Sequence, residues 1–233
     1  KLSSKDEVLI KVLINKLTTA YPEFSDRFIF TDRLSNFDGI IATGSNNSSR
    51  YFEEYFGKYA NIIRKNRNSV AILNGSESKA DIIVLGHDIF NYFGLGCRNV
   101  SKLYIHKDYD IKIVLEILHD EYKEIIHHNK YKNNFDYNNA LFLLNKEPFL
   151  MNGCIMVKES DQIASRIACL HYSYYDDEIA LIEILNSEKE KIQCIVAKTQ
   201  FSEIPTVNFG NAQSPAIDDY ADNVDTLQFL VSL

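Results

Sequence analysis

The sequence has few of the residues that build disulfide frameworks or structural zinc sites. Only four of its 233 residues are cysteine, and no two of them form a Cys-x-x-Cys pair. Such wide spacing argues against a disulfide scaffold and against structural zinc. His127-His128 has no cysteine nearby and no helical i, i+4 histidine partner, so it is interpreted as a surface pair. We expect no metal site.

Long apolar runs and an excess of positive charge are also missing. No apolar run approaches the roughly 20 residues that a membrane-spanning helix needs, and no signal peptide opens the chain. The formal net charge is −7, which argues against a general nucleic-acid binder. We therefore expect a reduced, cytoplasmic protein without a membrane span and without a nucleic-acid partner.

Several catalytic and nucleotide-binding motifs are missing as well. The chain has no Walker A loop, no full Gly-x-Gly-x-x-Gly fingerprint and no Gly-x-Ser-x-Gly elbow. A P-loop nucleotidase and a serine hydrolase are therefore disfavoured.

What is present is an alternation of helical and strand-like patterns. Helices are predicted over 8–17, 46–59, 79–93, 111–128 and 176–185, and strands over 28–30, 37–42, 69–73, 100–105, 167–174 and 192–197. The asparagine-rich stretch 129–139 is interpreted as a surface loop or frayed helix. The alternation predicts the α/β class with a largely parallel sheet, folded as one compact unit.

Cys97 is the centre of the most informative stretch. It lies between Gly96 and Arg98, where the predicted helix 79–93 gives way to the strand 100–105. Backbone N–H groups and an arginine beside a thiol favour the nucleophilic thiolate. The alternative is that Cys97 is a small buried hydrophobe, as isolated cysteines usually are.

Residues 43–50 form a second candidate site, where a strand meets a helix N-terminus. Free N–H groups behind Gly44 and Ser45 could hold an anion such as a pyrophosphate. The favoured alternative is that Ser45, Asn46 or Ser48 is simply the N-cap of the helix.

Taken in order, several segments resemble the aldehyde dehydrogenase superfamily, and more narrowly its acyl-CoA reductase branch, related to the fatty-acid reductase of bacterial bioluminescence. The segments are 1–4, 37–45, 69–75, 94–97, 209–213 and 219–233. The resemblance implies a partial dinucleotide-binding (Rossmann-type) region at 1–74, a mainly parallel α/β catalytic domain at 75–208 and a C-terminal segment at 209–233 that could serve oligomerisation. Family members carry about a domain's length before the lysine that Lys1 matches. The chain therefore resembles an N-terminally truncated member.

The resemblance also implies roles for single residues. Cys97 would be the nucleophile that becomes acylated, with Gly96, Arg98 and Asn74 supporting the loop or the substrate. The cofactor would be NADPH or NADH. The residues that contact it would be Lys1, Ser4, Gly44 and Ser45. Ser4 stands where NAD-preferring members often have glutamate. Because serine has no negative charge to repel the 2′-phosphate, this position favours NADPH.

Two departures from the family pattern shape the predicted reaction. Ile72 falls near the place of the general-base glutamate. Because an apolar side chain cannot activate water, hydrolysis of the acyl-enzyme should be slow. Asp161 or Gln162 is the nearest counterpart of the glutamate that holds the nicotinamide ribose. The predicted function is reduction of a long-chain acyl-CoA or acyl-protein thioester to a fatty aldehyde by a homo-oligomer. The alternatives are an acyl-accepting or assembly module without redox turnover, and an aldehyde dehydrogenase.

Overall fold

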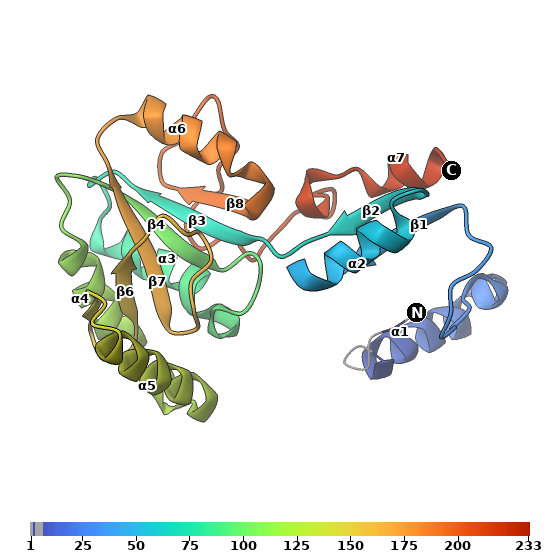
Figure 1. Ribbon diagram of the computed structural model, residues 1–233, viewed down its shortest axis with the longest axis horizontal. Helices are drawn as coiled ribbons and strands as arrows, with labels where there is room; N and C mark the ends of the chain where they lie inside the picture. The colour runs from blue at the N-terminus through green and yellow to red at the C-terminus, as the bar shows by residue number, and fades with distance from the viewer. Residues whose placement is uncertain (1, 3–6) are drawn as a thin grey trace.

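The computed structural model describes Leu2 and residues 7–233. Figure 1 shows two lobes rather than one compact unit. The smaller lobe holds a two-stranded sheet and the larger lobe a six-stranded sheet. The change of sheet falls between β2 and β3, which are joined by only a few residues. The division of the chain at residues 74 and 208 stays a prediction.

The smaller lobe is built from segments near both ends of the described chain. Its elements are α1 (Glu7–Ala20), η1 (Pro22–Arg27), β1 (Gly39–Thr43), α2 (Asn46–Phe56), β2 (Ala60–Arg64), η5 (Ala221–Asn223) and α7 (Thr226–Val231). β1 and β2 are parallel, with Ile41 opposite Ile62. A Cβ on Gly39 would lie 2.6 Å from a methyl group of Leu233, so the end of the chain packs closely on β1.

The larger lobe has the strand order β5-β6-β7-β4-β3-β8. The strands are β3 (Asn68–Leu73), β4 (Val100–His106), β5 (Leu150–Met151), β6 (Met156–Glu159), β7 (Cys169–Tyr175) and β8 (Ile192–Ala197). Every neighbouring pair is parallel except β5 and β6. The prediction of an α/β fold with a largely parallel sheet is confirmed.

Helices pack on both faces of the large sheet. They are α3 (Lys79–Phe90), η2 (Asn91–Gly94), α4 (Ile111–Tyr122), η3 (Lys123–His127), α5 (Asn129–Leu144), α6 (Glu178–Ser187) and η4 (Lys189–Lys191). Leu103 and Ile105 of β4 join the core that includes α3, α4 and α5. Tyr104, pointing to the other face, joins the core that includes α6. Burying each large apolar side chain contributes about 1.5–3 kcal/mol.

The structure differs from the predicted local structure in three places. Residues 28–30 form no strand, because no other strand pairs with them, and Ile29 is 84% exposed. Residues 60–64 form β2, which was not predicted. Residues 129–144 form the regular helix α5, whose Tyr131, Phe135 and Phe142 are buried at helical spacing. The intervening asparagines hid this pattern.

The apolar end of the chain forms a short helix. Residues 226–231 form α7, capped by Asp225, whose side chain accepts from the N–H of Gln228 at 2.8 Å. Self-association stays a prediction.

Candidate functional site

Cys97 lies in the turn between η2 and β4, and its side chain is exposed. The chain leaves α3 through Tyr92 and Phe93, which have φ values of 54° and 60°, followed by Gly94 with φ 72°. The left-handed region costs a residue with a side chain about 1–2 kcal/mol, so two such residues in succession are a strained segment. Strain of this kind persists only where the surrounding structure fixes it.

The backbone of the turn is fixed from two sides. The Asn99 side-chain oxygen accepts from the Gly96 N–H at 2.8 Å. On the other side, the Ser69 hydroxyl of β3 donates to the Cys97 carbonyl at 3.1 Å. The thiol is thus carried on a held backbone while its side chain is open to solvent.

The thiol faces a cleft of about 500 Å³ between the two lobes. Gly44, at the end of β1, lines it from the smaller lobe, and Gly96, Cys97 and Arg98 line it from the larger lobe. The other lining residues are Thr43, Arg64, Lys65, Asn66, Arg67, Asn68, Leu95, Gln193, Pro215, Asp219, Ala221 and Asp222. The structure therefore brings together four of the predicted site residues.

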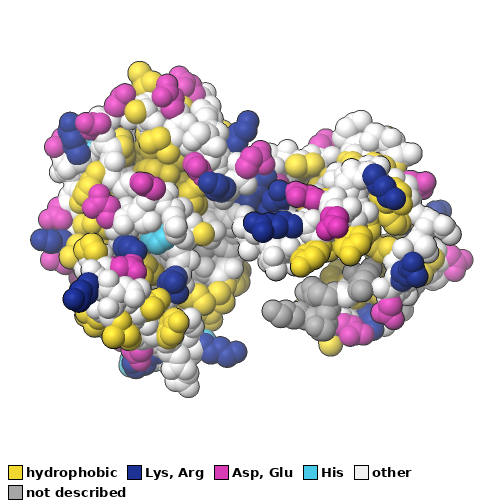
Figure 2. All heavy atoms as spheres, in the orientation of Figure 1, with side chains coloured by type: hydrophobic (Ala, Val, Ile, Leu, Met, Phe, Trp, Pro, Cys, Tyr) yellow, Lys and Arg dark blue, Asp and Glu magenta, His cyan; other side chains and the backbone are white. Residues whose placement is uncertain are grey.

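The cleft is rich in basic groups. Figure 2 shows Lys and Arg side chains gathered at the junction of the lobes. Arg67 contacts Asp222 at 3.5 Å and Glu190 at 3.4 Å, whereas Arg64 donates through Nη2 to the Thr226 hydroxyl at 3.2 Å. Among the described residues, the buried Arg64 Nε has no hydrogen-bond partner. Guanidinium groups of this kind suit phosphate or carboxylate ligands.

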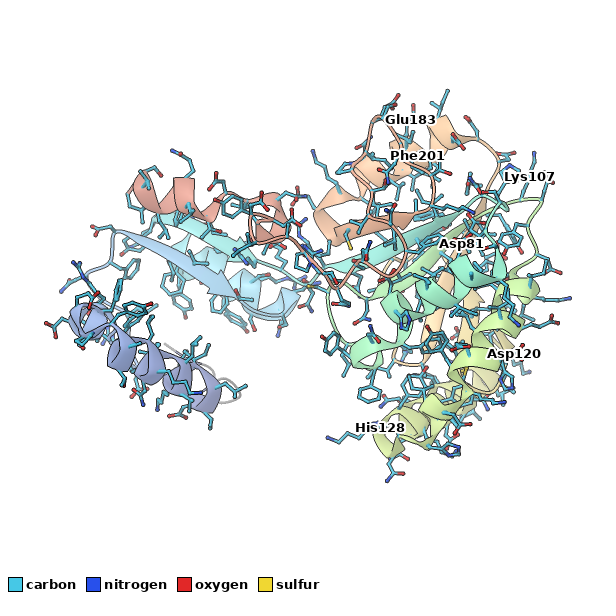
Figure 3. All side chains as sticks on the ribbon, turned by 180° about the vertical axis from the view of Figure 1, so that it is seen from behind. Asp81, Lys107, Asp120, His128, Glu183 and Phe201 are labelled. Carbon is cyan, nitrogen blue, oxygen red and sulfur yellow. The ribbon has the colours of Figure 1, made fainter. Side chains whose placement is uncertain are left out.

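Two further pockets adjoin the cleft. One, of about 440 Å³, shares Asn66 and Asn68 with it and also includes Asp161 and Gln162. The other, of about 600 Å³, shares Leu95. Its wall includes Phe93 stacked on His128, with ring centroids 4.0 Å apart; Figure 3 labels His128 at this end of the larger lobe. The cleft thus continues on both sides of the Cys97 turn.

Ser45 is the N-cap of α2, as the favoured alternative predicted. Its hydroxyl accepts from the N–H of Ser48 at 3.2 Å, and it does not line the cleft. Gly44 does, and a Cβ there would lie 2.8 Å from that of Ser48 and 2.9 Å from the Phe52 ring. The absence of a side chain at Gly44 therefore lets Ser48 and Phe52 of α2 pack closely on the end of β1.

Asn74 is not brought to Cys97. It follows the carboxyl end of β3, whereas Cys97 precedes the amino end of β4, and these two strands are parallel. At about 3.3 Å per residue, a strand of six residues separates the two sheet edges by about 20 Å. Asn74 instead donates to the Thr199 hydroxyl at 3.1 Å.

Ile72 likewise does not stand at the cleft. It is buried in the core shared with α6. The neighbouring residues that line the cleft are 64–68, which lie one strand earlier in the chain. The placing of Ile72 near a general-base position was therefore wrong, because residues 69–73 run inside the large sheet.

The other three cysteines are poor nucleophiles. Burial raises the pKa of Cys154 to about 11 and that of Cys169 to about 12. Burial also raises the pKa of Cys194, whose sulfur lies 2.9 Å from the Ser69 hydroxyl. Cys97 is the exposed thiol of the chain.

The remaining predictions concern Lys1 and Ser4, a metal site and a membrane-spanning helix. Lys1 and Ser4 lie outside the described residues. Within residues 2 and 7–233, no group of three His, Cys, Asp or Glu side chains could hold a metal ion. No helix in the same range is both long and apolar enough to cross a membrane.

Sequence reasoning missed Asn99, Ser69 and the basic residues 64–67 as parts of the site. Asn99 and Ser69 act through side-chain contacts to backbone atoms, for which their local sequence gives no distinct pattern. Arg64, Lys65 and Arg67 are close together in the sequence, but their position beside Cys97 depends on how the lobes meet.

No protein-family model and no curated protein matches the chain. Solved structures do. The gamma-glutamyl-gamma-aminobutyraldehyde dehydrogenase from Burkholderia cenocepacia J2315 matches at 16% identity with a TM-score of 0.51, covering 71% of this chain and 40% of its own. The NAD-dependent aldehyde dehydrogenase from Sinorhizobium meliloti matches at 10% identity and TM-score 0.54, covering 73% and 41%.

An aldehyde dehydrogenase from Bacillus cereus in complex with NAD+ matches at 13% identity and TM-score 0.52, covering 72% of this chain and 40% of its own. The chain thus spans about two fifths of the length of these proteins. At such identities the likeness concerns the fold. The chain has the mostly parallel α/β fold of aldehyde dehydrogenase structures.

Proposed function

We propose that this chain carries the nucleophile of an acyl-CoA reductase, which converts an acyl thioester into an aldehyde. The observation that carries the proposal is the exposed thiol of Cys97, held on a fixed turn that lines the cleft between the lobes together with Gly44. A nucleophile and a cofactor-binding helix start at one cleft are what this reaction needs.

In the first step, the Cys97 thiolate attacks the carbonyl carbon of the thioester. The carbonyl oxygen becomes an oxyanion, for which the Cys97 N–H is one donor. When the carbon–sulfur bond of the substrate breaks, the CoA thiolate leaves and the acyl group remains on Cys97. The pocket of about 600 Å³ that begins at Leu95 has room for an acyl chain.

The residues of the cleft fit a dinucleotide. Gly44 lines the cleft two residues before the first residue of α2, and Arg64 has a buried Nε without a partner among the described residues. Gly44, Arg64 and Lys65 would hold the phosphates, and Asp161 or Gln162 in the adjoining pocket would contact the ribose. Bound NAD(P)H would supply the hydride that releases the acyl group as an aldehyde.

The carboxylates at the cleft favour reduction over hydrolysis of the acyl-enzyme. Asp222 contacts Arg67 at 3.5 Å, and Asp219 accepts from the N–H of Ala216 at 2.9 Å. Each of these carboxylates already has a donor partner on one oxygen, which argues against a free general base at the cleft. An aldehyde dehydrogenase that hydrolyses its acyl-enzyme is therefore the weaker candidate.

Intact-mass analysis of the complete protein tests the proposal. Mixing with an acyl-CoA should add one acyl group, and NADPH or NADH should then remove it with formation of aldehyde. Cys97→Ala should abolish the adduct, while Cys194→Ala, at the nearby half-buried thiol, should retain it. An adduct that forms equally in Cys97→Ala would overturn the assignment of the nucleophile.

The second candidate function is that of an acyl-accepting or assembly module without redox turnover. It would show the same adduct on Cys97 but no binding of NADPH or NADH and no clearance by them. Nucleotide binding by calorimetry on the complete protein separates the two functions.

A further inference from the structure

The hydrogen bonds of the Cys97 turn divide its backbone N–H groups into two sets. The Leu95 N–H donates to the Tyr92 carbonyl at 3.2 Å, and the Asn99 N–H donates to the Gly96 carbonyl at 3.0 Å. The Gly96 N–H is taken by the Asn99 side chain at 2.8 Å. In the part of the chain that the structure describes, the N–H groups of Cys97 and Arg98 have no acceptor.

The Asn99 side chain holds the turn in this conformation. The residue is 1% exposed, and its Nδ2 donates to the carbonyls of Asp88 at 2.9 Å and Asn91 at 2.8 Å. One amide group therefore links the end of α3, the strained segment η2 and the turn. A buried side-chain amide with both ends bonded has little freedom to move.

Two successive N–H groups left open at a turn form a concave site for a negative charge. One belongs to Cys97, on which the acyl group would form, and the other to Arg98, which lines the same cleft. The Arg98 guanidinium is directed elsewhere, since its Nη1 donates to the Ala212 carbonyl at 3.1 Å. The backbone, and not this side chain, is thus the free donor at position 98.

We infer that the Arg98 backbone N–H is the second oxyanion donor of the site, beside that of Cys97, and that Asn99 is the residue that positions the pair. Asn99 does so by taking up the Gly96 N–H and fixing the turn. The inference rests on the proposed function, because an oxyanion forms only if Cys97 attacks a carbonyl group. In that step the new sulfur–carbon bond places the electron pair of the carbonyl π bond on oxygen. Collapse of the oxyanion expels the thiolate of the substrate, which takes a proton from water.

Two reactions of the same thiol separate this role from general support of the fold. Acylation by an acyl-CoA passes through an oxyanion, whereas alkylation by iodoacetamide does not. In Asn99→Ala, we expect acylation of Cys97 to slow by about 100-fold, as when one oxyanion donor is lost, with alkylation changed by less than about threefold. Both rates are followed by intact mass on the complete protein.

Two further variants keep the test decisive. Asn138→Ala removes another buried asparagine, which donates to the Ile167 carbonyl at 3.0 Å, and should leave the ratio of the two rates unchanged. Gly96→Ala would place a Cβ 2.9 Å from the Asn99 oxygen, so it disturbs the same contact without removing a hydrogen-bonding group. It should lower the ratio even if Asn99→Ala fails to fold.

The outcomes distinguish the inference from the function on which it rests. Equal slowing of acylation and alkylation, or slowing of neither, in both Asn99→Ala and Gly96→Ala would overturn the inference alone. If the unaltered protein is alkylated at Cys97 but not acylated by any acyl-CoA, the proposed function is wrong and the inference is wrong with it.

Discussion

Gly44 and Cys97 line the same cleft although they lie beside strands of different sheets. Gly44 directly follows β1 of the smaller lobe, and Cys97 lies in the turn before β4 of the larger lobe. A ligand that fills the cleft therefore contacts both lobes. The proposed reaction needs this arrangement, because one lobe presents the nucleophile and the other the helix start at which a dinucleotide would bind.

Brief treatment with iodoacetamide should label Cys97 alone in the folded protein. Its side chain is exposed, whereas burial raises the pKa of the other three thiols, including Cys154 to about 11. Peptide mapping by mass spectrometry checks the site. Labelling in urea should reach all four cysteines; early labelling of Cys194 in the folded protein would contradict the prediction.

Ser45 allows the capping role and the ligand-binding role to be separated. Ser45→Ala should lower the free energy of unfolding by about 1 kcal/mol, because the Ser48 N–H loses its acceptor. Ser45→Asp should retain the cap and hence the stability, since aspartate is a good N-cap. Its negative charge beside Gly44 should nevertheless weaken the binding of NADPH, measured by calorimetry. Unchanged NADPH binding in Ser45→Asp would argue against phosphates at this helix start.

Asp81 should contribute to stability in a pH-dependent way. A hydrogen bond from Lys198 at 2.8 Å, together with bonds from Ser78, lowers the pKa of Asp81 to about 2. Because the folded pKa lies below the ordinary value, the contribution is present above that value and is lost as the pH falls towards about 2.

Asp81→Asn should therefore cost about 1 kcal/mol at neutral pH, as expected for a lost capping interaction, and less at acid pH. Urea denaturation at several pH values measures this. Asp120, labelled with Asp81 in Figure 3, is the control. It contacts Lys79 at 3.5 Å on an exposed surface, so Asp120→Asn should change stability little. A pH-independent cost for Asp81→Asn would contradict the prediction.

Asp88 fixes the segment that supports Arg98. Its buried carboxylate accepts from the N–H groups of Gly210 at 2.6 Å and Ala212 at 3.0 Å. Asp88→Ala should lower the free energy of unfolding by about 2–3 kcal/mol, because two N–H groups lose their acceptor. Thermal or chemical denaturation of the complete protein checks this value.

The pH dependence of Asp88 should have the opposite sign to that of Asp81. Burial raises the pKa of Asp88, against the opposing effect of its two hydrogen bonds. The folded state then favours the protonated form. The contribution to stability is full below the ordinary pKa and is lost as the pH rises through the raised value. Asp88→Asn should abolish this loss; if stability still falls over the same interval, another group is responsible.

Parts of the fold could be predicted because local patterns determine them. The apolar spacing of α3 and the β-branched run of β4 identified the two elements on either side of Cys97. The helix α5 was missed because its buried aromatic residues are separated by asparagines, which resemble a loop. Short β2 was missed because its position depends on pairing with β1 rather than on its own sequence.

The site was predictable only where neighbours in sequence are neighbours in space. Gly96, Cys97 and Arg98 share one turn, so their association followed from the sequence. Asn74 was misplaced because its part in the site was inferred from the order of segments, whereas the parallel course of β3 and β4 puts it at the opposite sheet edge. The residues of the smaller lobe that lie near the thiol are brought there by tertiary packing, so no local sequence pattern predicts their position.

The path of the chain between the lobes has a mechanical consequence. The chain crosses once between β2 and β3 and returns after β8 to reach α7 (Figure 1). Arg67 of the first crossing contacts Asp222 of the return at 3.5 Å. Two crossings joined by an ion pair restrict rotation of one lobe against the other more than a single crossing would, and Gly44 and Cys97 line the cleft beside this junction.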